Sequence, residues 1–123
     1  MAADDLEVAS QFRVALEAAA KTGDRSAVYP MLASDVEWVA PQRTLHGIDE
    51  VREDMIWGFP PDQLDIEFEL GSLEDPGDGR IAFGVHEIYR MKGTGDFAYE
   101  RDRRIELTIR DGKISRHEMK IIR

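Results

Sequence analysis

The alternation of apolar and polar residues predicts long strands in the second half of the chain. In residues 64–70, LDIEFEL, every second residue is apolar and those between are acidic. Residues 81–91, IAFGVHEIYRM, alternate in the same way, and further strands are predicted for residues 97–110 and 113–122. Asp111-Gly112 between the last two is a strong signal for a two-residue hairpin. Successive side chains of a strand point to opposite faces, so each strand turns one face toward a core.

The first half of the chain predicts three helices and one short strand. Apolar residues at helical spacing indicate a helix over residues 6–21, and Asp24 caps a shorter helix that runs toward Leu32. A third amphipathic helix starts at Ile48 and closes near Gly58, and residues 35–40, DVEWVA, predict a strand. Turns are expected at residues 44–47 (TLHG), 74–80 (EDPGDGR) and 92–96 (KGTGD).

This order of elements predicts the fold class. Helices come first and long antiparallel strands follow, which is typical of an α+β domain with helices packed on one face of a sheet. The length of 123 residues suits a single domain over residues 1–123. No apolar run approaches the ~20 residues that span a bilayer, and the start lacks the pattern of a signal peptide. We therefore expect a cytoplasmic protein with no membrane contact.

Charge and composition exclude several classes of function. The net charge is −9, which disfavours binding to nucleic acid, and the arginines after residue 89 sit in alternating strands among acidic residues. There is no cysteine, and the three histidines show no ligand spacing, so we expect no metal site and no cofactor. No phosphate-binding glycine loop or serine nucleophile motif is present.

One carboxylate breaks the apolar pattern of residues 81–91. Counting by twos from Ile81 places Glu87 on the row of large apolar side chains, which faces the core. On the next strand Arg101 and Arg103 share the inward row, and on the last strand His117 does the same. Two interpretations stay open: a proton-transfer set of Glu87 and His117 with an arginine for an anionic oxygen, or a structural ion pair without catalysis.

Three stretches carry a resemblance to a known family, namely MLASDVEWVAP, LHGIDEVRE and RDGKISRHEMK. With the order of helices and strands, the chain resembles the SnoaL-like and ketosteroid-isomerase-like branch of the nuclear-transport-factor-2-like superfamily. The resemblance implies a cone-shaped, curved antiparallel sheet wrapped around three N-terminal helices, with a pocket at the open end. It also implies dimerisation through the outer face of the sheet in many members.

The catalytic groups of the known branches are missing at the matching positions. The carboxylate base of the ketosteroid isomerases would stand at Ala40, and their tyrosine near Leu16. The limonene-epoxide-hydrolase-like pattern keeps one carboxylate at Glu87 but has Met119 in place of the second aspartate. The SnoaL-like cyclases carry an acid where this chain has Ile122. Activity therefore does not follow from the resemblance.

Two hypotheses on function result. The first is a cofactor-independent enzyme of isomerase, cyclase or hydrolase type, in which Glu87 and His117 transfer protons on an apolar, oxygen-bearing substrate. The second is a non-catalytic domain that binds a small apolar ligand or serves as a dimeric module. The residues expected to contact the small molecule are Trp38, Ala40, Phe68, Arg101, Arg103 and Met119. A homodimer is expected through an outward surface formed by Ala82, Gly84, Ile88, Arg104, Glu106 and Thr108.

Overall fold

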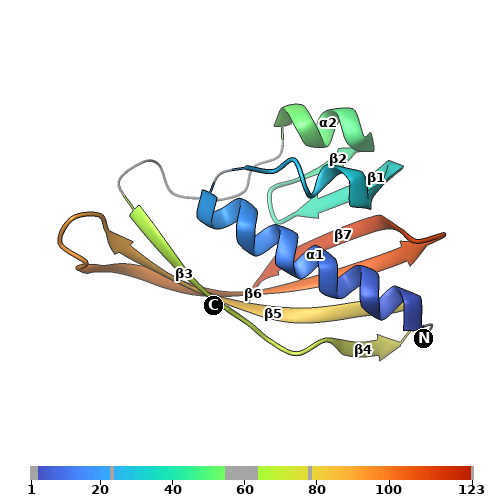
Figure 1. Cartoon of the computed structure of the whole chain (residues 1–123). Coiled ribbons are helices and arrows are strands. Elements are labelled where there is room, and N and C mark those ends of the chain that lie inside the picture. The colour runs from blue at the N-terminus through green and yellow to red at the C-terminus, as the bar shows by residue number, and fades with distance from the viewer. Residues whose placement is uncertain (1–2, 23, 55–63, 78, 123) are drawn as a thin grey trace.

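The computed structural model describes residues 3–22, 24–54, 64–77 and 79–122, and Figure 1 shows the course of the chain. Two α-helices and seven strands occur in this part of the chain. The elements are α1 (Ala3–Thr22), a 3-10 turn (Tyr29–Met31), β1 (Leu32–Ala40), β2 (Arg43–His46), α2 (Gly47–Asp54), β3 (Leu64–Leu70), β4 (Glu74–Gly77), β5 (Arg80–Met91), β6 (Phe97–Arg110) and β7 (Lys113–Ile121).

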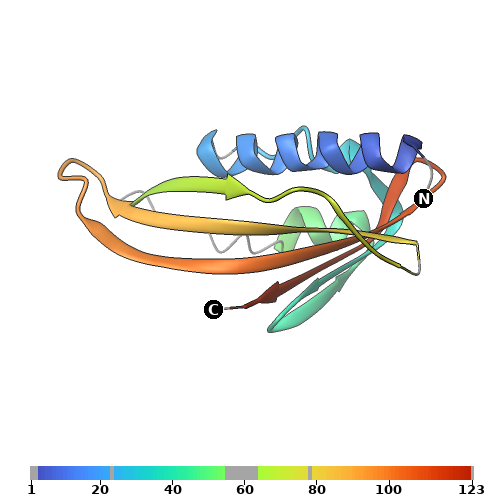
Figure 2. The ribbon, with the colours of Figure 1, turned by 90° about the horizontal axis from the view of Figure 1, so that it is seen from below.

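The strands form one curved, open sheet. Their order is β2-β1-β7-β6-β5-β3, and β4 pairs with β5 outside this path. The pairs are antiparallel except that β1 runs parallel to β7. The hairpin of β5 and β6 is long and carries the sheet well beyond α2 and β1, while α1 lies along one face of the sheet (Figures 1 and 2). We call the face that packs against α1 the inner face.

The core lies between α1 and the inner face. Ala9, Phe12, Leu16 and Ala19 recur at helical spacing and are buried, as the sequence predicts. Across from them the alternating residues Ile81, Phe83, Val85, Ile105 and Leu107 of the two long strands are buried as well. Burial of one such side chain stabilises the folded state by about 1.5–3 kcal/mol, so this contact contributes strongly to stability.

The predicted inward row of β5 is confirmed. Ile81, Phe83, Val85, Glu87 and Tyr89 are all buried, whereas His86 and Arg90 on the other face are half-buried. The register then places Glu87 opposite Arg101 and Val85 opposite Arg103 on β6. The hairpin after β6 is also as predicted: Asp111 and Gly112 have φ values of +53° and +75°, and a type I′ turn needs positive φ at both positions.

The α+β class and the curved sheet are confirmed, but the helices differ from the prediction. The segment from Asp24 toward Leu32 forms only a 3-10 turn, so two α-helices rather than three occur in the described ranges. Asp24 accepts a hydrogen bond from the backbone N–H of Ser26 at 2.9 Å, which closes a local turn instead of capping a helix. The expected end of the third helix near Gly58 lies outside the described residues.

Two predicted turns are strands. Residues 43–46 form β2, in which Leu45 pairs with Trp38 of β1, and residues 74–77 form β4. Each strand has only four residues, which is too short for alternation to show. The sheet is also mixed rather than purely antiparallel, because β1 joins β7 in parallel. The apolar pattern tells which face of a strand is buried, and it carries no information on the direction of its neighbour.

No helix of the described residues is long and apolar enough to cross a membrane.

Candidate functional site

A pocket of about 200 Å³ opens beside the inner face where β1, β2, β6 and β7 meet. The pairing of Trp38 with both Leu45 and His117 brings β1, β2 and β7 together at this point. An apolar cavity of about 150 Å³ holds benzene, so this pocket suits a molecule of about one ring with a short substituent. Its lining residues are Trp38, Ala40, Pro41, Gln42, Arg43, Leu45, Arg101, Met119 and Ile121.

Glu87 lies behind the pocket in a buried cluster with two arginines. Its carboxylate is fully buried, and its Oε1 accepts a hydrogen bond from Arg101 Nε at 2.8 Å. Its Oε2 accepts another from Arg103 Nη2 at 3.1 Å, and Arg103 Nε lies 2.9 Å from Oε1 without hydrogen-bond alignment. Both carboxylate oxygens are therefore occupied by guanidinium donors. We call Glu87, Arg101 and Arg103 the Glu87 cluster.

Arg101 is the member of the Glu87 cluster that reaches the pocket. Its side chain is 19% exposed, against 9% for Arg103. It donates from Nη2 to the hydroxyl of Tyr89 at 3.2 Å, and its guanidinium lies 5.7 Å from the centre of the Tyr89 ring. The Tyr89 ring is stacked on Tyr99 at 4.4 Å. Arg101 is thus fixed in place before any ligand arrives.

Burial and the two positive charges shape the pKa values in this region. Burial lowers the pKa of Arg103, and the neighbouring Arg101 adds to the effect. Burial also opposes the charge of Arg101, but its hydrogen bond and ion pair with Glu87 raise the pKa of Arg101 overall. A guanidinium stays protonated in proteins, so both arginines are cationic. Burial, followed by the charge of Glu87, raises the pKa of Tyr89 to about 12, so its hydroxyl is neutral at pH 7.

His117 packs against the pocket wall from the core side. It is 3% exposed, its ring stacks on Trp38 at 3.7 Å between centroids, and Phe12 meets it edge-on at 5.8 Å. No described residue forms a hydrogen bond with its buried Nδ1. Burial, with a contribution from the positive Arg103, lowers the pKa of His117 to about 3. The imidazole is therefore neutral at pH 7.

The structure divides the predicted site residues into two groups. Trp38, Ala40, Arg101 and Met119 line the pocket together. Glu87, Arg103 and His117 are buried behind it and are not among its lining residues. The backbone of Phe68 pairs with that of Glu87, but the side chain of Phe68 lies outside the described part of the structure.

Sequence reasoning missed three residues of this region, Arg43, Leu45 and Tyr89. Arg43 and Leu45 belong to β2, a four-residue strand that overlaps the predicted turn at residues 44–47 and shows no alternation. Tyr89 carries a usable signal, because it stands two residues after Glu87 and shares its face of the strand.

The outer face of the sheet carries a network of charges. His86 Nδ1 lies 2.5 Å from Asp102 Oδ1 and its Nε2 lies 3.1 Å from Glu100 Oε2. The hydrogen bond with Asp102 raises the pKa of His86 most, and burial opposes it. No group of three or more described His, Asp or Glu side chains is arranged to hold a metal ion. The homodimer expected through this face stays a prediction.

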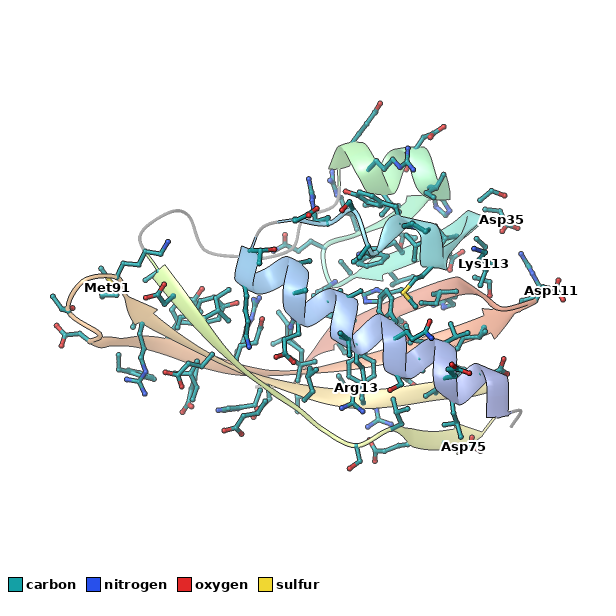
Figure 3. All side chains as sticks on the ribbon, in the orientation of Figure 1. Arg13, Asp35, Asp75, Met91, Asp111 and Lys113 are labelled. Atoms are coloured by element: carbon teal, nitrogen blue, oxygen red, sulfur yellow. The ribbon has the colours of Figure 1, made fainter. Side chains whose placement is uncertain are left out.

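The opposite end of the sheet from the long hairpin is also charged. Arg110 Nη2 lies 2.9 Å from Asp35 Oδ1, and Lys113 Nζ donates to the backbone carbonyl of Pro30 at 2.7 Å. Figure 3 shows Asp35, Asp111 and Lys113 close together at this end and Met91 at the far end, where the hairpin turns. Arg110 and Arg101 are thus positive residues of the same strand in separate surroundings.

Comparison with known proteins first places the fold among the nuclear-transport-factor-2-like proteins. An NTF2-like protein from Anabaena variabilis ATCC 29413 matches with a TM-score of 0.75 at 16% identity, covering 98% of this chain and 92% of the other. An NTF2-like protein of unknown function from Burkholderia pseudomallei K96243 matches with a TM-score of 0.72 at 19% identity, covering 98% and 92%. TerC, co-crystallised with polyporic acid, matches with a TM-score of 0.68 at 20% identity, covering 93% and 91%.

The sequence then identifies the family within this fold. The profile of the SnoaL-like domain matches residues 8–117, so the chain belongs to the SnoaL-like family. The resemblance stated from the sequence is confirmed. No curated protein matches the chain. At 16–20% identity, the structural likenesses establish the fold alone.

Proposed function

We propose that this protein binds a small apolar molecule that carries an oxygen group, in the pocket between Trp38, Met119 and Arg101. One observation supports this most: the pocket combines apolar walls with a guanidinium that is already held in place. Ligand pockets of proteins are generally apolar with a few fixed polar groups, which set the orientation of the ligand. The apolar walls would contact the body of the molecule, and Arg101 would meet its oxygen.

The way in which Arg101 is held favours binding. Glu87 and Tyr89 fix its guanidinium from behind, so little side-chain freedom is lost when a ligand contacts it. The apolar residues of the pocket lower the local dielectric, which strengthens a hydrogen bond to the guanidinium. The small-molecule complex of TerC, which has the same fold, agrees with a ligand pocket here.

Acid–base catalysis of isomerase, cyclase or hydrolase type is the second candidate. It is favoured by the position of Glu87, which Arg101 joins to the pocket, and by His117, which stacks on the pocket residue Trp38. A direct proton transfer to Glu87 would require a substrate to displace Arg101, because both carboxylate oxygens accept guanidinium hydrogen bonds. Under this candidate, the wild-type protein catalyses deuterium exchange at the α-carbon of a ketone probe such as phenylacetone in D₂O. Glu87→Gln should abolish this exchange. If the wild-type protein catalyses no such exchange, this form of the candidate is ruled out.

The binding proposal is tested with one-ring amides as probes. We expect cinnamamide and 3-phenylpropionamide to shift the NMR signals of Leu45, Met119 and the Trp38 indole in a saturable way. Ala40→Phe fills the pocket and should abolish these shifts, because Ala40 lines it. Val39→Phe is the matched control: Val39 is the preceding residue of β1, on the opposite face, and this variant should bind like the wild type.

Two results would contradict the proposal. One is the absence of saturable shifts for the amides and for the corresponding carboxylates. The other is unchanged binding in a folded Ala40→Phe variant, which would place the ligand somewhere else on the protein.

A further inference from the structure

The walls of the pocket are arranged in rows across the inner face of the sheet. In the first row, Trp38 of β1 pairs with His117 of β7. Ala40 and Met119, each two residues further along these parallel strands, form the second row, and Ile121 belongs to the third. A strand rises about 3.3 Å per residue, so neighbouring rows are about 7 Å apart. The pocket therefore extends along the strands from the first row to the third.

The exposure of the lining residues increases from the first row to the third. Trp38 and its partner Leu45 on β2 are each 5% exposed, so the core closes this end of the pocket. Met119 in the second row is half-buried, whereas Ile121 in the third row is 51% exposed. The lining residues 41–42, which follow β1 at the same end, are exposed as well. The pocket thus has one closed apolar end and one open end.

This asymmetry gives a bound molecule a preferred direction. An apolar ring is removed from water most completely at the closed end, between Trp38 and Leu45. Arg101, which would meet the oxygen of the ligand, lies toward the open end. Arg103 is the residue of β6 that pairs with Ile121, and Arg101 comes two residues beyond it. The carbonyl of a bound amide or ester should therefore point out of the pocket.

Apolar surface remains at the open end when the pocket holds one ring. The volume of about 200 Å³ suits a ring with a short substituent, which reaches along the first two rows. Ile121 in the third row then keeps its exposed surface. A linear apolar group attached beyond the carbonyl would leave the pocket over this side chain and cover it. Covering the exposed half of an isoleucine side chain raises affinity about fivefold.

We infer that the pocket binds the aromatic end of a longer molecule, namely an amide or ester of an aryl-substituted acid whose alkyl chain continues beyond the carbonyl and lies over Ile121. This inference rests on the proposed function, since it assumes that the pocket binds an apolar molecule with an oxygen group. It goes further by naming the direction of the ligand and its chemical class. The probes described next separate the two statements.

The test compares two isomers that carry the same butyl group at opposite ends of cinnamamide. NMR titration at pH 7 measures the affinities of N-butylcinnamamide, para-butylcinnamamide and cinnamamide. We expect the N-butyl isomer to bind about fivefold more tightly than cinnamamide, because its chain covers Ile121. The para isomer should bind about tenfold more weakly than the N-butyl isomer, or weaker still, because the closed end has no room for a chain. Nonspecific apolar binding would not separate the two isomers.

Two adjacent isoleucines provide a matched pair of variants. Ile121 lines the pocket, whereas Ile122 lines a shallow hollow of the outer face with Gly84 and His86 and is 61% exposed. In Ile121→Ser the advantage of N-butylcinnamamide over cinnamamide should fall from about fivefold to about twofold or less. Ile122→Ser removes the same kind of exposed side chain and should keep the full advantage.

The direction of the ligand is also measured without any variant. In the wild-type protein, nuclear Overhauser effects should connect the ring protons of N-butylcinnamamide with the Leu45 methyl groups. They should connect the end of its butyl chain with the methyl groups of Ile121. The reverse pattern, with the ring at Ile121 and the chain at Leu45, overturns the inference.

The remaining outcomes are equally decisive. Equal affinity of the two isomers, or tighter binding of the para isomer, overturns the inference and leaves the proposed function in place. The same conclusion follows if Ile121→Ser keeps the full advantage, or if Ile122→Ser loses it as well. Binding of the corresponding carboxylates without binding of the amides also overturns the inference alone. If neither the amides nor the carboxylates bind, the proposed function is wrong and the inference falls with it.

Discussion

Replacement of Glu87 by alanine is expected to lower the free energy of unfolding by about 3–5 kcal/mol. The substitution leaves Arg101 and Arg103 without their shared carboxylate in a region where water cannot replace it. Domains of this kind are stable by only about 5–15 kcal/mol in total, so the loss is a large fraction of the stability. Urea denaturation of the two proteins, followed by circular dichroism, measures the difference.

A matched ion pair at the surface provides the control. Arg90 Nε lies 2.8 Å from Glu67 Oε1, the same distance as between Arg101 and Glu87, but Glu67 is 57% exposed. Glu67→Ala should therefore cost about 1 kcal/mol or less, because water solvates the arginine that remains. If Glu87→Ala costs no more than Glu67→Ala, the Glu87 cluster is not a structural element of the core.

The same residue distinguishes the two candidate functions. Glu87→Gln keeps the size of the side chain and one acceptor oxygen but removes the charge, so a smaller loss of stability than for Glu87→Ala is expected. If Glu87 mainly holds Arg101 in position, this variant changes stability and ligand affinity together. If Glu87 also transfers protons, the variant abolishes deuterium exchange as well, and the loss of exchange is then much larger than the change in affinity explains.

The sequence predicts the direction of Glu87 and names the arginines on its face, but it does not determine how these side chains meet. Strict alternation in β5 determines which face each side chain takes, and that result needs no knowledge of the neighbouring strands. The closure of the cluster depends on the register. It sets Glu87 directly opposite Arg101, and it sets Val85, two residues before Glu87, opposite Arg103. A single sequence does not determine this register. From the sequence, a carboxylate in the pocket and a buried ion pair are therefore equal alternatives for Glu87.

Only some of the residues that line the pocket can be predicted from the sequence, because the pocket also depends on how the strands pair. Trp38, Ala40 and Met119 lie in strands whose alternation is visible in the sequence, and all three line the pocket. Arg43 and Leu45 come from a four-residue strand next to a turn, where no period can be recognised. The parallel pairing of β1 with β7 joins residues as far apart in the sequence as Trp38 and His117, and no local pattern indicates such a long-range contact.

A second large effect is expected from pH, through His117. The pKa of His117 is about 3 in the folded protein, against 6.5 for an unperturbed imidazole. The folded state thus binds fewer protons than the unfolded state between these pH values, so stability decreases as the pH falls below about 6.5. The loss approaches about 1.4 kcal/mol per pH unit, or about 2 kcal/mol at pH 5. His117→Phe removes the titrating group but keeps a ring beside Trp38 and Phe12.

The measurement is the difference in unfolding free energy between His117→Phe and the wild type, at pH 7 and at pH 5. This difference should shift by about 2 kcal/mol in favour of the variant at the lower pH. His86→Gln serves as a control of opposite sign. Contact with Asp102 raises the pKa of His86, so its stabilising effect is present below pH 6.5 and is lost as the pH rises through the raised value. His86→Gln should therefore be more harmful at pH 5 than at pH 7. A His117 ring that titrates near 6.5 by NMR in the folded protein would contradict the prediction, because a buried imidazole wedged between Trp38 and Phe12 should remain neutral throughout that range.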